Sequence, residues 1–175
     1  MKVKPWLLLV FVVAALLCAC SKKTGLQIGD TVPTITLTDL RGGPFTLPSD
    51  VRGKVVLIRF WAIDCGFCEK EKLFTLERFY QKYKDRSFLP VAVNVGPVEK
   101  NDARFEQFRQ LTYPLLVDQY GAAAKQFGVK FLPATLVIDE EGVLRGKISG
   151  EAEPDAYEML FTTVLNKGGF YENGH

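Results

Sequence analysis

The residues best suited to chemistry in this chain are two cysteines, Cys65 and Cys68, which are separated by Gly66 and Phe67. Two thiols at this spacing can cycle between a dithiol and a disulfide, and such a pair is a redox motif where a strand passes into a helix. The sequence has a single histidine, His175. Catalysis by cysteine or serine with histidine, and zinc sites built on histidine, are therefore not expected.

Other uses of this cysteine pair compete with a redox cycle. A purely structural disulfide would close so small a loop that it removes little chain entropy. A zinc site would need two more ligands, whereas two soft thiolates could hold Cu(I) between them. Asp64 before Cys65 also suits a peroxidase, but the Pro-x-x-x-Thr-x-x-Cys pattern of peroxiredoxins is missing. Redox cycling is the leading interpretation; a peroxidase and a Cu(I)- or thiol-binding module are the alternatives.

The elements around the pair indicate how it could be activated. Val55–Trp61 is an almost continuous apolar run, typical of a strand buried on both faces. Apolar residues at three- and four-residue spacings predict a helix over 67–84. Cys65 would then stand at a helix start, where free backbone N–H groups and the helix dipole stabilise a thiolate. The pattern predicts Cys65 as the attacking thiolate and Cys68, on the same face, as the more buried resolving thiol.

The rest of the chain alternates short strands with helices. Its 175 residues are 47% hydrophobic and 24% charged, as in ordinary globular proteins. A hairpin is expected around Gly42-Gly43-Pro44, strands at 89–95, 115–117, 135–138 and 143–148, and helices at 102–111, 121–127 and 154–166. This order predicts one α/β domain over 30–170.

The first residues predict an exported protein. Lys2 and Lys4 precede an apolar run of twelve residues, Trp6 to Leu17. This is the layout of a signal peptide over 1–20, and the run is short for a membrane-spanning helix. A chain without Lys2 and Lys4 has 20 basic and 20 acidic residues, so it is formally neutral. Such a charge balance predicts no binding of nucleic acid.

The end of this leader resembles the bacterial lipoprotein box. The match is Leu17 to Cys20, and it implies that Cys20 is lipidated and becomes the mature N-terminus, while Cys18 leaves with the signal. Residues 21–29 would then be a tether between membrane and domain. Ordinary cleavage after Ser21 and an uncleaved anchor are the alternatives. Ser21 after the lipidated cysteine favours the outer over the inner membrane.

Several motifs besides the cysteine pair match one family. They are Arg52–Leu57 leading into Phe60–Ala62, Glu71, and Phe131–Thr135 followed by Leu136–Gly142. Over most of 28–165 the chain resembles the TlpA/ResA-like thiol-disulfide oxidoreductases of the thioredoxin superfamily. The resemblance implies a thioredoxin-like fold, in which helices flank a central mixed sheet with an N-terminal hairpin and an inserted β-α element. No cofactor and no metal are expected, because the sequence offers the cysteine pair no further well-placed ligands.

The resemblance also implies roles for individual residues. Pro133 would be a cis-proline, and Leu132 before it would offer backbone groups to an extended substrate segment. A trans proline at the start of a strand is the alternative. Glu71 would serve in proton transfer at Cys68, unless it is a solvated carboxylate that pairs with Lys70 or another base. Further substrate contacts are expected from Trp61, Gly66 and Phe67.

By the same resemblance, the partners would be exported proteins that carry disulfides, with apocytochromes c as one candidate. A membrane thiol-electron donor would reduce the oxidised pair again. The protein would be a monomer on the periplasmic side of a bacterial membrane.

Three residues depart from the family pattern. Asp64 stands where tryptophan is usual, Phe67 replaces a common proline, and Arg59 occupies a strand position that is often Asn or Asp. Arg59 is interpreted as a snorkelling or salt-bridged residue. Negative charge around the pair, from Asp64, Glu69 and Glu71, would raise the pKa of Cys65. Since a less stabilised reduced form makes a poorer oxidant, we expect a reductant.

Overall fold

The computed structural model describes residues 25–99, 102–166 and 171–172. Several predictions lie outside these residues: the signal peptide over 1–20, the lipidation of Cys20, the fate of Cys18 and the first part of the tether, 21–24. His175 lies outside them too.

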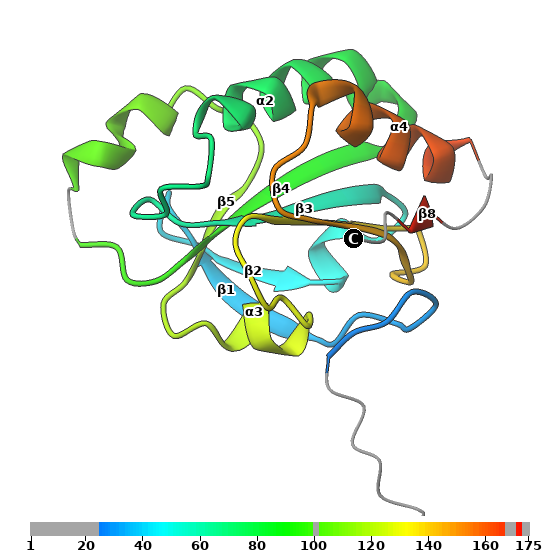
Figure 1. The fold of residues 1–175 in the computed structure, drawn as a ribbon, viewed down its shortest axis with the longest axis horizontal. Coiled ribbons are helices and arrows are strands. Elements are labelled where there is room, and N and C mark those ends of the chain that lie inside the picture. Colours follow the sequence, from blue (N-terminus) through cyan, green and yellow to red (C-terminus); the bar gives the residue numbers. More distant parts are fainter. Residues whose placement is uncertain (1–24, 100–101, 167–170, 173–175) are drawn as a thin grey trace, which may run out of the picture.

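An eight-stranded mixed sheet runs through the domain in the order β2-β1-β5-β4-β3-β6-β7-β8 (Figure 1). The strands are β1 (Ile35–Asp39), β2 (Pro44–Leu47), β3 (Val55–Trp61), β4 (Phe88–Val95), β5 (Leu115–Asp118), β6 (Ala134–Ile138), β7 (Leu144–Ser149) and β8 (Tyr171–Glu172). Strand β3 pairs with β4 in parallel and with β6 antiparallel. All its residues are buried, as its apolar run predicts.

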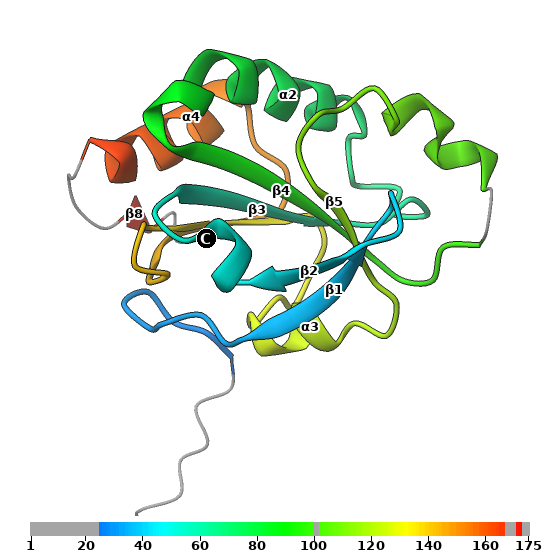
Figure 2. The same cartoon turned by 180° about the vertical axis from the view of Figure 1, so that it is seen from behind.

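Helices cover both faces of the sheet. Helices α2 (Glu71–Tyr83) and α4 (Pro154–Leu165) lie together on one face, and the short α3 (Ala122–Gln126) lies on the other (Figures 1 and 2). The described residues also form three 3-10 helices: η1 (Ser49–Val51), η2 (Lys84–Arg86) and η3 (Ala103–Phe108). The N-terminal hairpin is β1–β2, and the segment between β4 and β6 adds β5 and α3.

The sheet separates two apolar cores. Successive side chains of a strand point to opposite faces, so Leu57 and Trp61 of β3 enter the core under α2 and α4, whereas Phe60 enters the core on the α3 side. In the first core Phe161 of α4 stacks on Phe88 of β4, with 4.0 Å between ring centroids. The site-bearing strand is thus held from both sides.

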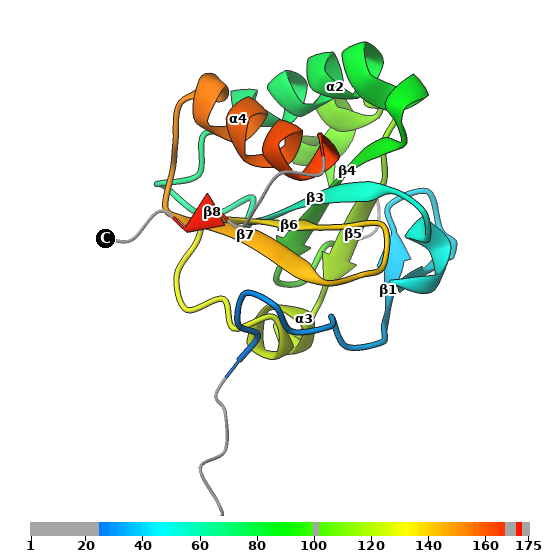
Figure 3. The same ribbon diagram turned by 90° about the vertical axis from the view of Figure 1, so that its right-hand side faces the viewer.

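Most predicted elements are present, with three differences. The helix predicted over 67–84 begins only at Glu71. The segment predicted as a helix over 102–111 is the 3-10 helix η3, although Asp102 does cap it by accepting the N–H of Arg104 at 3.0 Å. Strand β8, at the sheet edge in Figure 3, was not predicted. Apolar spacing locates a helix face but not its first turn, whose N–H groups lack helical partners.

The part of the expected tether that the structure describes, 25–29, packs against the domain. Leu26 is buried in the core on the α3 side, and the N–H of Gly29 donates to the carbonyl of Leu144 at 2.8 Å. The prediction that these five residues lie outside the domain is therefore wrong, because Leu26 gains from burial. None of the helices described is long and apolar enough to cross a membrane.

Candidate active site

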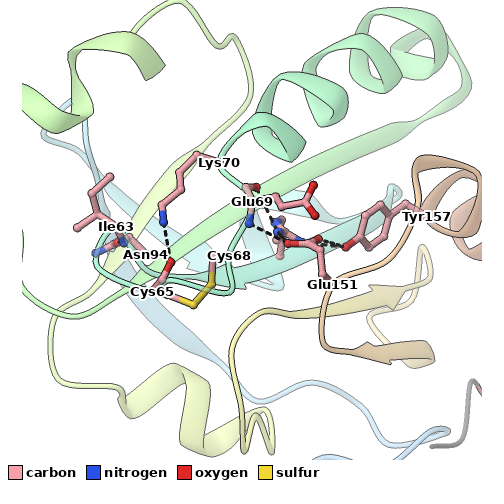
Figure 4. The surroundings of a disulfide bond; sticks show 9 residues. Ile63, Cys65, Cys68, Glu69, Lys70, Asn94, Glu151 and Tyr157 are labelled. Carbon is pink, nitrogen blue, oxygen red and sulfur yellow. Dashed lines mark hydrogen bonds and ion pairs between the residues drawn. A yellow bond between two sulfur atoms is a disulfide. The ribbon is translucent and has the colours of Figure 1, made fainter.

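Cys65 and Cys68 form a disulfide in the turn between β3 and α2, with their Cα atoms 5.4 Å apart (Figure 4). The N–H of Cys65 donates to the carbonyl of Ala62 at 3.2 Å, and that of Cys68 to the carbonyl of Cys65 at 3.3 Å. Cys68 is 3% exposed, whereas Cys65 is half-buried. The predicted difference in burial between attacking and resolving cysteine is confirmed.

The predicted placement of Cys65 at a helix start is wrong. Helix α2 begins at Glu71 with Lys70 as its N-cap, so Cys65 lies more than one turn before it. The influence of a helix dipole fades within the first turn. The dipole of α2 is therefore a weak source of thiolate stabilisation at Cys65.

Side chains hold the backbone of the active-site loop, residues 62–70, in place of helical hydrogen bonds. The Oδ1 atom of Asn94, at the end of β4, accepts the N–H of Ile63 at 2.9 Å. The Nζ atom of Lys70 donates to the carbonyl of Cys65 at 2.6 Å. On the far side of the disulfide, Oε2 of Glu151 accepts the N–H of Glu69 at 2.9 Å. Figure 4 shows these contacts on both sides of the pair.

Glu151 belongs to a buried cluster that it forms with Arg59 and Tyr157. Arg59 of β3 is 1% exposed, and its Nη2 atom pairs with Oε2 of Glu151 at 2.7 Å. Its Nη1 atom donates to the hydroxyl of Tyr157 at 3.0 Å, and that hydroxyl donates to Oε1 of Glu151 at 2.6 Å. The salt-bridged interpretation of Arg59 is confirmed. Sequence reasoning missed Glu151 and Tyr157; it also passed over Asn94, which the apolar run of β4 could have singled out.

The predicted cis-proline is present. The peptide bond between Leu132 and Pro133 is cis, and the carbonyl of Pro133 accepts the N–H of Gly150 at 2.8 Å. Because Phe60 pairs with Ala134 in the antiparallel register, the start of β6 lies beside the end of β3. Pro133 and the active-site loop therefore lie side by side at one end of the central strands β3 and β6. Leu132 is half-buried against both cores.

The other predicted site residues divide into exposed and buried ones. Gly66 is exposed and Phe67 is 85% exposed, so both are open to a partner. Trp61 is 1% exposed and packs on Phe105 and Phe108 of η3, so its predicted substrate contact is wrong for this structure. The side chain of Glu71 is exposed and makes no hydrogen bond or ion pair with another described residue. This exposure fits the alternative of a solvated carboxylate, although its pairing with Lys70 or another described base is not formed.

The described residues include no group of three or more His, Cys, Asp and Glu side chains placed to hold a metal ion.

Comparison with known proteins decides the family: the AhpC/TSA family model matches residues 28–147. The chain belongs to the AhpC/TSA family. It is 35% identical over 144 residues to thiol-disulfide oxidoreductase ResA of Geobacillus kaustophilus, covering 82% of each chain. It is also 35% identical over 127 residues to thioredoxin-like protein YneN of Bacillus subtilis, covering 71% of this chain and 72% of that one.

Among solved structures, this AhpC/TSA-family protein resembles a putative thiol:disulfide interchange protein DsbE from Chlorobium tepidum. The TM-score is 0.69 at 30% identity, covering 81% of this chain and 98% of that one. The thioredoxin-like fold and the ResA-like assignment are thereby confirmed. This similarity and the Cys65–Cys68 disulfide together identify the chain as a thiol-disulfide oxidoreductase of the ResA type.

Two groups of the buried cluster in this AhpC/TSA-family oxidoreductase have shifted pKa values. Burial by itself would raise the pKa of Glu151, but hydrogen bonds from Arg59 and Tyr157 outweigh it, and the pKa lies below the ordinary 4.5. Burial raises the pKa of Tyr157 to about 12. At neutral pH the carboxylate is therefore ionised and the phenol keeps its proton, as their hydrogen bonds require.

We expect this protein to lose stability in acid through Glu151 in particular. Its folded-state pKa is lower than its unfolded value of 4.5, so its stabilisation is present above that pH and is lost as the pH falls through the folded value. The free energy of unfolding, from urea titrations, should therefore drop below about pH 5. The drop should be shallower for Glu151→Gln. If the free energy of unfolding falls equally steeply with pH in Glu151→Gln and wild type, Glu151 is not a source of the acid sensitivity.

The charge around the active-site loop is more balanced than the sequence suggests. Exposed Asp64 pairs with Arg104 of η3, which Asp102 holds from the other side at 2.7 Å. Glu69 pairs with Lys72 at 3.4 Å. Together with Lys70, these cations offset the negative charge counted in the sequence. The negative charge around Cys65 is therefore partly compensated and disfavours the thiolate less than the sequence count suggests.

The reactivity of Cys65 is expected to fall when Arg104 is replaced by alanine. The carboxylate of Asp64, next to Cys65 in sequence, would then be unpaired and would disfavour the thiolate. Because the pair is exposed, we expect alkylation by iodoacetamide at pH 7 to slow only about two- to fivefold. Cys68→Ala is the background, so that Cys65 reacts alone. Arg109→Ala, which removes an exposed arginine beside the end of η3, is the control, and equal rates in both variants would refute the prediction.

Proposed function

We propose that this oxidoreductase is exported, tethered to a membrane through Cys20, and reduces disulfides in other exported proteins. The observation that carries the proposal is the half-buried Cys65 joined to the buried Cys68, at the end of the central strands where cis-Pro133 also lies. The signal-peptide pattern over 1–20 and the relatives named as ResA support it. Exported proteins, with apocytochromes c as one candidate, are the proposed clients.

The reaction is two successive thiol-disulfide exchanges. The Cys65 thiolate attacks one sulfur of a client disulfide; that bond breaks, a mixed disulfide forms, and the first client thiolate leaves and takes up a proton. Cys68 then loses its proton and attacks the sulfur of Cys65, and the second client thiolate leaves. The client gains two electrons, and the protein is left with the Cys65–Cys68 disulfide. A membrane thiol-electron donor is proposed to reduce that pair again.

The exposed aromatic ring of Phe67 and the half-buried Leu132 supply apolar contacts for a client segment near the sulfur of Cys65. An extended client segment can pair with the backbone at Leu132, before the cis-proline. Glu71, exposed at the start of α2, is proposed to exchange protons with solvent during the attack by Cys68.

Reduction of insulin disulfides tests the activity, with hydrogen peroxide as the competing substrate. We expect the reduced protein to precipitate insulin chains and to leave peroxide largely unconsumed. Because the dipole of α2 stabilises a Cys65 thiolate only weakly, the reduction potential should lie near the roughly −270 mV of thioredoxin rather than the roughly −120 mV of the oxidant DsbA. Rapid peroxide turnover, tight stoichiometric Cu(I), or a potential near that of DsbA would each contradict the proposal.

The tether has a test of its own. Cys20→Ala should move the protein from the membrane fraction to the soluble fraction of the cells that produce it, because the lipid is attached at that sulfur. Cys18→Ala is the matched control and should leave the distribution unchanged. A membrane-bound Cys20→Ala variant would favour an uncleaved anchor instead.

A further inference from the structure

We propose that Glu151 is a positioning residue for the resolving cysteine and acts through the backbone of the active-site loop. Glu151 lies in the segment between β7 and α4, yet its Oε2 atom accepts the N–H of Glu69 at 2.9 Å. Glu69 directly follows Cys68 in the chain. A carboxylate from a distant segment thereby fixes the peptide unit next to the resolving thiol (Figure 4).

The carboxylate of Glu151 is itself firmly held. Arg59 binds Oε2 at 2.7 Å and Tyr157 binds Oε1 at 2.6 Å, so both oxygens have a partner inside the protein. The hydroxyl of Tyr157 also accepts the N–H of Ala152 at 3.1 Å, which fixes the segment that carries Glu151. The carboxylate cannot turn away from Glu69 without leaving the guanidinium of Arg59, 1% exposed, without its charged partner.

The two cysteines are held by different side chains. Asn94 and Lys70 bind the backbone at Ile63 and Cys65, on the side of the attacking thiol. The backbone N–H of Cys68 has only the turn bond of 3.3 Å, and the next N–H along the chain is the one that Glu151 holds. Loss of Glu151 should therefore displace Cys68 more than Cys65. Displacement by about 1 Å from a reactive geometry can slow a reaction by as much as about a hundredfold.

This inference rests on the two-step exchange of the proposed function, but its test needs no protein client. The probe is 5,5′-dithiobis(2-nitrobenzoate), a small aromatic disulfide. Cys65 of the reduced protein attacks it and one coloured thiolate leaves; Cys68 then attacks the sulfur of Cys65, and the second coloured thiolate leaves as the Cys65–Cys68 disulfide forms. The first phase of colour reports attack, and the second reports resolution. A protein that fails on insulin can still show both phases.

The main variant is Arg59→Met with Glu151→Met, which removes the acceptor for the N–H of Glu69 and leaves no unpaired buried charge. We expect its first phase to stay within about twofold of wild type and its second phase to slow at least about tenfold. In Arg59→Met with Glu151→Gln, the amide oxygen can still accept the N–H of Glu69. This variant should restore the second phase to within about threefold of wild type.

Lys72→Met is the matched control, because the ammonium group of Lys72 pairs with the side chain of Glu69 and leaves the backbone N–H of Glu69 to Glu151. The second phase should then stay near wild type, while the first slows at most about fivefold, because Lys72 also offsets negative charge near Cys65. If the main variant resolves as fast as wild type, or if both phases slow equally, the proposal is overturned. Should the main variant not fold, Tyr157→Phe, which frees only one oxygen of Glu151, must slow the second phase at least about twofold, and an unchanged second phase there refutes the proposal.

Discussion

Mixed disulfides with client proteins are expected to accumulate on a Cys68→Ala variant and to be missing from a Cys65→Ala variant. In the proposed reaction a client reaches the half-buried sulfur of Cys65, whereas Cys68, 3% exposed, would release the client. Without Cys68 the intermolecular bond persists, because no neighbouring thiol can attack it. Either substitution should lower catalysed insulin reduction about a thousandfold or more, since both steps of one cycle are required.

The measurement is a comparison in cells that export the protein. Thiols are blocked in acid, adducts are separated without reductant, and the proteins bound to Cys65 are identified by mass spectrometry. A variant that lacks both cysteines sets the background. If Cys65→Ala collects adducts as well as Cys68→Ala does, the two roles are reversed. If the trapped proteins are not exported ones, the proposed client class is wrong although the chemistry stands.

The features that the sequence predicted correctly are those that a short stretch of chain encodes. The spacing of Cys65 and Cys68, the motif around Pro133 and the apolar run of β3 each lie within a few consecutive residues. The start of α2 was misplaced because the active-site loop is held by side chains from elsewhere, which no local helix signal records. Trp61 was misjudged because its burial depends on Phe105 and Phe108, which follow much later in the chain.

The ion pairs around the site were not predicted, because their partners lie far apart in the sequence. Arg59 stood out as an unusual strand residue, but Glu151 is 92 residues away from it and meets it only because β6 and β7 bring the chain back beside β3. Asp64 and Arg104 are 40 residues apart, so a count of charges near the cysteines misses the cation. Charge partners are a property of the topology, and local patterns do not specify them.

Glu151→Met is expected to be the most destabilising single substitution in the buried cluster, by about 3–5 kcal/mol of unfolding free energy. It leaves the guanidinium of Arg59, 1% exposed, without its anion, and the Nε atom of that side chain already lacks a hydrogen-bond partner among the described residues. The hydroxyl of Tyr157 would remain as the main acceptor for the cation. A neutral oxygen compensates a buried charge only in part.

Arg59→Met should lower the free energy of unfolding by less, because the carboxylate that it leaves unpaired is partly exposed and keeps other hydrogen-bond donors. The side chain of Glu151 is 19% exposed and keeps the donors of Glu69 and Tyr157. The double variant, Arg59→Met with Glu151→Met, should unfold within about 1 kcal/mol of wild type, because it leaves neither charge unpaired. Urea denaturation of all four proteins gives the coupling free energy directly. If Arg59→Met proves as costly as Glu151→Met, burial of the cation is not what makes Glu151 indispensable, and the anion's own contacts must dominate instead.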